Sequence, residues 1–229
     1  MINGMRIIDA DGHVQERDAP WQDLLEEPYR KHAPRVVKDP NGRSELLLEG
    51  KIWAKPSGVG CGIGTAPISR RPQSTTGMFD PVQRLKDMDL EGIDTAVNFG
   101  TTVFLSLPFL ENRDLACAIA RAYNNWLAGY CRTDSRRLKG VALVAMQEPG
   151  ETAKELARCV KELGFVAVAV AAHSAGRNLD HPDFHDFYAK AEELGIPVCV
   201  HVGRADRRRR QIASTIRFSC TPQRTPSNR

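Results

Sequence analysis

The chain has 229 residues, a length that allows one large domain or two small ones. Its content of 41% hydrophobic and 26% charged residues excludes wholesale disorder, and no apolar run is long enough for a transmembrane helix. The net charge of +4 is unevenly distributed, because residues 204–229 hold eight arginines and one acid. Residues 1–203 are therefore mildly acidic, and the overall charge says little about them.

The first predicted element is a β-strand at residues 6–10, and a long insertion over residues 16–78 follows it. Within the insertion, residues 44–53 predict a hairpin that turns at Glu49-Gly50. Residues 55–77 are rich in Gly, Pro, Ser and Thr and predict a loop. An insertion after a barrel strand usually shapes the mouth of an active site, because the loops that follow the strands share one face.

From residue 80 onward, helices and strands alternate. Asp80-Pro81 predicts a helix start, with Asp as the N-cap and Pro at the first helical position, and Gly92 ends that helix. The remaining predicted elements, in chain order, are a strand at 95–99, a helix at 111–131, a strand at 141–145, a helix at 149–163, a strand at 166–171, a helix around 184–191 that Gly195 closes, and a strand at 197–201.

Apolar strands that alternate with amphipathic helices predict an α/β fold with a parallel sheet covered on both faces. Two architectures remain, a doubly wound sheet and a TIM-type (β/α)8 barrel. A complete barrel needs eight strands and typically about 250 residues, so the barrel we expect here is incomplete, with about five βα units present and three missing. After Gly203 the pattern stops, and we expect residues 204–229 to form a disordered, arginine-rich tail.

Side chains that can bind a metal stand at the ends of two predicted strands. Asp11 and His13 follow the first strand, where residues i and i+2 point the same way. His201 ends the fifth strand, and barrel active sites lie at that end of the strands. Carboxylate and imidazole ligands suit zinc, manganese or iron. The alternative interpretation is a turn aspartate, a surface histidine and a histidine hydrogen-bonded at the end of the sheet.

Other features of the sequence bear on substrate, compartment and partners. His173 follows the fourth strand and is either a substrate contact or a plain loop histidine. The six cysteines form no C-x-x-C pair and no signal peptide precedes the first strand, so we expect reduced thiols in a cytoplasmic protein. The arginines of the tail could contact phosphates, but no aromatic or helical platform accompanies them, which argues against a nucleic-acid partner.

A series of short motifs runs in order through residues 6–203. They are Ile7–His13, Phe79–Asp94, Asn124-Asn125-Trp126, Leu163-Gly164-Phe165, Asn178-Leu179-Asp180 and Ala191–Pro197 leading into His201. In these motifs the chain resembles the amidohydrolase superfamily. More narrowly, it is similar to the amidohydrolase-related branch that includes aminocarboxymuconate-semialdehyde decarboxylase and the dihydroxybenzoate decarboxylases.

The resemblance implies a (β/α)8 barrel in which a divalent metal, zinc or alternatively manganese, is held by an H-x-H pair after strand one, a histidine after strand five and an aspartate after strand eight. Asp11 stands where the first histidine of the pair usually is, while His13 and His201 match the second and the strand-five ligand. The family's histidine after strand six and aspartate after strand eight have no counterpart in residues 1–203, so no catalytic acid or base is assigned.

The resemblance also implies a metal-dependent hydrolase or a non-oxidative decarboxylase of a small, often aromatic, organic acid, and it is compatible with a homo-oligomer. The alternative is a non-catalytic fragment of such an enzyme, truncated or frameshifted, because out-of-frame translation would give an aperiodic, arginine-rich tail. In that case we expect weak or no stoichiometric metal binding, since strands six to eight would supply the residues that make the site rigid.

Overall fold

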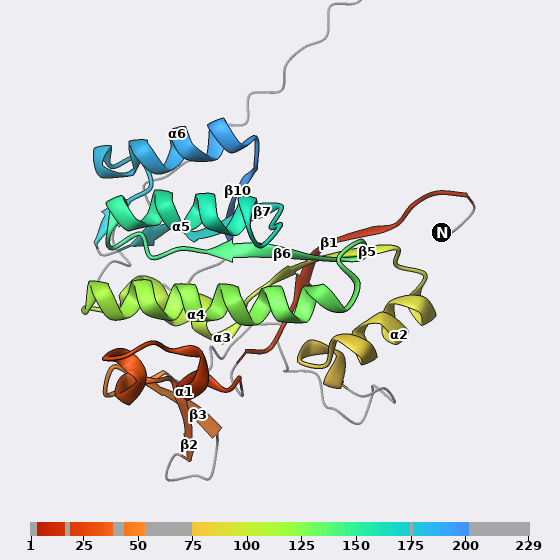
Figure 1. Cartoon of the computed structure of the whole chain (residues 1–229), viewed down its shortest axis with the longest axis horizontal. Coiled ribbons are helices and arrows are strands. Elements are labelled where there is room, and N and C mark those ends of the chain that lie inside the picture. The colour runs from red at the N-terminus through yellow and green to blue at the C-terminus, as the bar shows by residue number, and fades with distance from the viewer. Residues whose placement is uncertain (1–3, 17–18, 39–43, 54–74, 175, 202–229) are drawn as a thin grey trace, which may run out of the picture.

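A parallel sheet forms the centre of the molecule in a computed structural model, which describes residues 4–16, 19–38, 44–53, 75–174 and 176–201 (Figure 1). Its strands lie in the order β1-β5-β6-β7-β10, and each neighbouring pair is parallel. The order follows the sequence, which confirms the predicted α/β sheet. The strands are β1 (Ile8–His13), β5 (Thr95–Phe99), β6 (Leu138–Leu143), β7 (Ala167–Ala171) and β10 (Val198–His201).

The sheet curls into part of a barrel. In a flat sheet with strands about 4.8 Å apart, β1 and β10 would lie roughly 19 Å from each other, too far for an aspartate and a histidine to touch. Yet Asp11 Oδ1 lies 3.2 Å from His201 Nε2. The curvature therefore decides between the two predicted architectures: the fold is an incomplete (β/α)8-type barrel rather than a flat doubly wound sheet.

The helices α4, α5 and α6 run alongside one another next to the sheet (Figure 1). α4 contacts β6 and α5, and α5 contacts α6. Leu115, Ile119 and Leu127 of α4 recur at helical spacing and are fully buried. They form the apolar face that the sequence predicts for this helix. None of the helices in the described part of the chain is both long and apolar enough to cross a membrane. The connecting helices are α2 (Pro81–Glu91), α4 (Arg113–Cys131), α5 (Pro149–Lys161) and α6 (His185–Leu194).

The ends of α2 follow from its sequence. The Asp80 carboxylate accepts hydrogen bonds from the backbone N–H groups of Val82 and Gln83, at 2.9 and 3.3 Å. Gly92 takes the left-handed conformation, with a φ of 74°, that ends the helix. Both caps were predicted, and both are confirmed.

The described part of the insertion contains a three-stranded antiparallel sheet in the order β2-β3-β4. It includes the predicted hairpin, whose turn residues Glu49 and Gly50 have φ values of 53° and 70°. The Glu49 carboxylate accepts hydrogen bonds from the N–H groups of Glu111 and Asn112, so the hairpin tip docks at the start of α4. The elements are α1 (Trp21–Leu24), the 3₁₀ helix η1 (Tyr29–His32), β2 (Arg35–Lys38), β3 (Ser44–Leu48) and β4 (Lys51–Trp53).

Several elements differ from the sequence prediction. The strand predicted at 141–145 begins three residues earlier, because Leu138, Lys139 and Gly140 pair with β5. The end of the predicted loop 55–77 is a 3₁₀ helix, while residues 54–74 and the predicted tail 204–229 lie outside the described residues. The elements that the sequence did not predict are β2, α1, η1, η3 (Thr75–Met78), α3 (Thr102–Ser106), η4 (Leu107–Phe109), η5 (Arg132–Asp134), β8 (His173–Ser174), β9 (Arg177–Asn178) and η6 (Pro182–Phe184).

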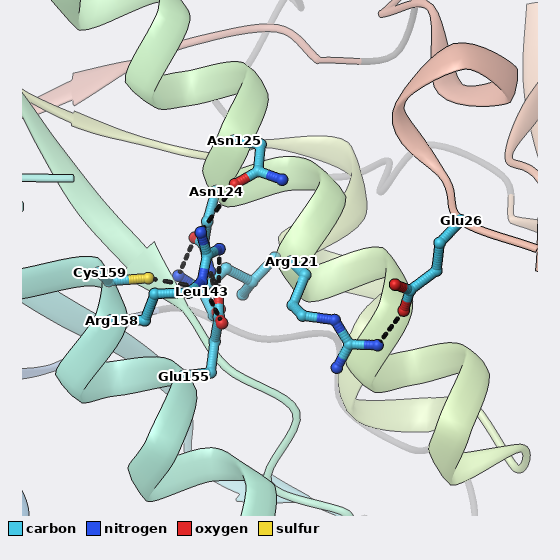
Figure 2. A network of polar contacts seen from close by, with 8 residues as sticks. All are labelled: Glu26, Arg121, Asn124, Asn125, Leu143, Glu155, Arg158 and Cys159. Carbon is cyan, nitrogen blue, oxygen red and sulfur yellow. Dashed lines mark hydrogen bonds and ion pairs between the residues drawn. The ribbon is translucent and has the colours of Figure 1, made fainter. Parts of the chain in front are cut away.

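A buried polar network joins α4, β6 and α5 (Figure 2). The Asn124 amide nitrogen donates to the carbonyl of Leu143 at 2.8 Å, and its oxygen accepts from the N–H of the same residue at 2.9 Å. The same nitrogen also donates to Glu155, which pairs with Arg158. One side chain thus satisfies both backbone groups at the end of β6 and ties two helices to it.

The described cysteines are free thiols, and three of the four are buried. Burial raises the pKa of the Cys117 thiol to about 11 and that of Cys131 to about 12. These thiols are therefore protonated at neutral pH and poor nucleophiles. The other two cysteines, Cys61 and Cys220, lie outside the described residues.

Candidate metal centre

Three side chains that can bind a metal meet at the carboxyl edge of the curled sheet. Asp11 and His13 come from β1, and His201 is the last residue of β10. Asp11 Oδ1 lies 3.2 Å from His201 Nε2 and 3.6 Å from His13 Nε2. One ligand atom from each residue lies within 4.8 Å of the others. The structure thus brings together all three side chains that the sequence predicts as metal ligands.

An irregularity in β1 helps to aim these side chains. The pairing of β1 with β5 shifts between Asp9 and Gly12, which is a β-bulge. The Asp9 carboxylate accepts the N–H of Asp11 at 3.1 Å inside the bulge. A Cβ on Gly12 would come within 3.1 Å of the Val97 carbonyl oxygen, so the close approach of the two strands favours glycine there.

The two histidines and the aspartate have different surroundings. The side chains of His13 and His201 are 19% and 20% exposed, whereas that of Asp11 is 72% exposed. The His201 ring stacks on Phe99 with 5.2 Å between centroids, and it lies perpendicular to the Phe104 ring with 5.3 Å between centroids. Aromatic rings therefore hold the imidazoles on one side, and the carboxylate faces solvent on the other.

The electrostatic environment favours a neutral His13. Burial is the main cause that lowers the pKa of its imidazole, and the nearby His201 lowers it further. Asp11 opposes the shift, as does a hydrogen bond with the backbone of Gly100. A neutral imidazole is the form that binds a metal ion.

A second layer of residues, which the sequence did not single out, holds His13. The Thr101 hydroxyl lies 3.2 Å from His13 Nδ1. Arg84 donates hydrogen bonds to the backbone carbonyls of His13 and Gly77. Arg84 lies within one of the motifs that carry the family resemblance, and Thr101 follows the carboxyl end of β5. These two positions in the sequence are the features from which the role of Arg84 and Thr101 could have been predicted.

The fourth candidate, His173, is placed only by its backbone. It lies in β8, where it pairs with Asn178 of β9. Its side chain is outside what the structure describes. A role for His173 in substrate binding therefore stays a prediction.

The donor set fits a divalent cation. Two imidazole nitrogens and one carboxylate oxygen are common ligands of zinc and manganese and leave coordination positions open. A family model described as Amidohydrolase matches residues 8–220. The chain belongs to the amidohydrolase family. The match continues past Gly203 into the arginine-rich segment, whereas the motif resemblance ended at residue 203.

Curated relatives of this amidohydrolase include decarboxylases. The chain is 34% identical over 130 residues to a gamma-resorcylate decarboxylase of Rhodococcus jostii strain RHA1, a match that covers 52% of this chain and 38% of the relative. It is 26% identical over 123 residues to a 2-amino-3-carboxymuconate-6-semialdehyde decarboxylase of Dictyostelium discoideum, covering 54% and 34%. The matched stretch thus spans little more than a third of each relative. Both relatives are decarboxylases of the branch that the motifs indicate.

Solved amidohydrolase structures share the fold. An amidohydrolase from Mycobacterium avium subsp. paratuberculosis K-10 superposes with a TM-score of 0.70 at 18% identity, over 87% of this chain and 59% of that one. A dihydroxybenzoic acid decarboxylase from Polaromonas sp. JS666, with bound manganese and the inhibitor 2-nitroresorcinol, gives a TM-score of 0.57 at 20% identity, over 92% and 53%. Both likenesses support the barrel-type architecture.

Proposed function

We propose that this amidohydrolase is a metal-dependent, non-oxidative decarboxylase of a small aromatic acid, with Asp11, His13 and His201 as ligands of a divalent cation. The observation that carries the proposal is the meeting of these three side chains at the carboxyl edge of the sheet. Residues 1–203 are then the metal-binding part of the barrel, and residues 204–229 are a separate segment. The free, buried thiols support a reducing, cytoplasmic location.

The names of the relatives favour decarboxylation over hydrolysis. Gamma-resorcylate is a dihydroxybenzoic acid, and the Polaromonas decarboxylase was solved with bound manganese and a resorcinol derivative as inhibitor. The carboxylate of Asp11, in place of a histidine, also makes the donor set harder, which favours manganese over the zinc that the resemblance alone suggests. Hydrolysis remains the alternative activity within the family.

The chain's own residues would prepare the site in three ways. The two imidazoles and the Asp11 carboxylate would hold the cation, whose charge, when bound, stabilises negative charge that develops on substrate oxygens. Phe99 and Phe104 cover one side of His201 and exclude water from it. In the reaction the ring carbon loses CO₂, keeps the electron pair of the broken bond and takes up a proton, so a proton donor is also required.

Metal binding is the first test, with chain 1–229 titrated with Mn²⁺ and with Zn²⁺. We expect one ion per chain, with weak affinity, and loss of binding in His13→Ala and in His201→Ala. His181→Ala is the matched control, because His181 caps the 3₁₀ helix η6 and is not among the three ligands. Equal binding by wild type and both site variants would overturn the assignment of the ligands.

Activity is the second test, measured as CO₂ release from gamma-resorcylate with Mn²⁺ present and, in parallel, as hydrolysis of an aryl ester. Loss of a general acid or base typically costs about 10²–10⁴-fold in rate, so we expect slow turnover relative to the Rhodococcus enzyme. Metal-dependent ester hydrolysis without CO₂ release would favour the hydrolase alternative. A rate equal to that of the Rhodococcus enzyme would contradict the fragment hypothesis.

A further inference from the structure

Besides the hydrogen bond with the backbone of Gly100, the hydrogen bonds of Thr101 constrain which nitrogen of His13 carries a proton. The Thr101 hydroxyl oxygen lies 2.8 Å from the carbonyl oxygen of Val14, which can only accept. The single hydroxyl hydrogen is therefore used in that bond. Toward His13 Nδ1, at 3.2 Å, the same oxygen can then only accept, so Nδ1 must be the donor.

This arrangement leaves the other nitrogen of His13 as a bare lone pair. His13 Nε2 faces Asp11 and belongs to the cluster that would hold the cation. We propose that Thr101 is a positioning residue that fixes His13 as its Nδ1–H tautomer and so presents Nε2 for metal binding. The inference rests on the proposed function, and it adds a residue that acts on a ligand rather than on the substrate.

Thr101 is itself held in place by a buried carboxylate. Both oxygens of Glu16 accept the N–H of Thr101, at 3.2 and 3.0 Å, and one of them also accepts the N–H of Val103. Glu16 is 0% exposed, and a buried carboxylate is costly unless its oxygens are hydrogen-bonded. The segment after β5 is therefore anchored to the segment after β1, with the Thr101 hydroxyl between them.

His201 has no comparable support among the residues that the structure describes. Its Nδ1 atom is buried without a hydrogen-bond partner there, while its Nε2 atom faces Asp11. The two histidines thus differ in preparation. His13 is held as a ligand by the Thr101 hydroxyl, whereas no described side chain plays that part for His201.

The experiment compares Thr101→Val, which removes the hydroxyl at nearly constant volume, with Thr101→Ser, which keeps it. Thr102→Val is the matched control: it removes the neighbouring hydroxyl, which accepts a hydrogen bond from Gln15 and not from His13. The first readout is the imidazole ¹⁵N spectrum of the metal-free chain at pH 8, with the His13 signals assigned from their loss in His13→Ala. The second is Mn²⁺ affinity, and thermal unfolding checks that each variant folds.

We expect the wild type, Thr101→Ser and Thr102→Val to show His13 protonated at Nδ1. Thr101→Val should lose that preference and bind Mn²⁺ about 10–100-fold more weakly. An unchanged His13 tautomer and affinity in a folded Thr101→Val chain would overturn the inference and leave the proposed function standing. If the wild type binds neither Mn²⁺ nor Zn²⁺, the proposed function fails, while the ¹⁵N spectra still decide the role of Thr101.

Discussion

Two adjacent asparagines in α4 show how much the position of a single residue matters. Asn124 is fully buried and pairs with both backbone groups of Leu143, whereas Asn125 is exposed and its side-chain oxygen accepts a hydrogen bond from the Arg158 guanidinium at 2.9 Å (Figure 2). The same type of side chain thus hydrogen-bonds a buried backbone at one position and makes a surface contact at the next.

We predict that Asn124→Ala destabilises the fold by about 2–4 kcal/mol, since it leaves two buried backbone groups without partners. Asn125→Ala, the matched control, should change the free energy of unfolding by less than about 0.5 kcal/mol. Urea denaturation of both variants measures the difference. Equal losses of unfolding free energy would mean that the Asn124 hydrogen bonds contribute no more than an ordinary surface contact.

The candidate site could be predicted in part. Asp11, His13 and His201 stand at strand ends, and strand ends were visible in the apolar pattern, so their convergence followed from the fold class. Thr101 and Glu16 could not be found that way. The Thr101 hydroxyl contacts the His13 ring, 88 residues earlier in the chain. The Glu16 carboxylate accepts hydrogen bonds from N–H groups 85 and 87 residues later. A role that depends on contacts so distant in sequence leaves no local pattern.

Helices show the same contrast at the scale of the element. α2 was predicted with both ends, because its caps, Asp80 and Gly92, are its own neighbours in sequence. α3 was missed, because Glu16 supplies the acceptors for its first N–H groups from another part of the chain. A helix whose cap is local can be predicted from sequence, and one whose cap is remote cannot.

Local capping of α2 predicts the effect of changing it. Asp80→Ala should cost about 1 kcal/mol, because the first turn loses its side-chain acceptor, and Asp80→Asn should retain most of the stability. Glu91→Ala is a suitable control at the opposite end of α2, where a negative charge is unfavourable with the helix dipole. Chemical denaturation of the three variants checks the order, and a loss in Asp80→Asn as large as in Asp80→Ala would argue against capping.

At the scale of the whole molecule, the outer strands of the half-barrel expose apolar side chains. Ile8 in β1 is 57% exposed and Val200 in β10 is 59% exposed. Within the described residues, each of these strands pairs on one side only. Such edges are templates for pairing with another chain.

We therefore expect chain 1–229 to associate as its concentration rises, and the double variant Ile8→Lys with Val200→Lys to reduce the association. A charge on an edge strand opposes edge-to-edge pairing. Leu90→Lys is the control, because Leu90 is 72% exposed on α2 and belongs to neither edge strand. Sedimentation velocity over a range of concentrations measures the association. An equal effect of Leu90→Lys would indicate nonspecific hydrophobic association rather than pairing of the edge strands.

The distance in sequence between Asp11 and His201 has a consequence for the order of folding. The two residues are 190 positions apart, and they meet only after every strand between them has joined the sheet. A refolding intermediate that lacks β10 offers only the two neighbouring ligands of β1. A cation present from the start of refolding would be bound by all three ligands only in molecules in which the last of the five strands has docked. The rate of cation binding would therefore report the rate at which β10 joins the sheet.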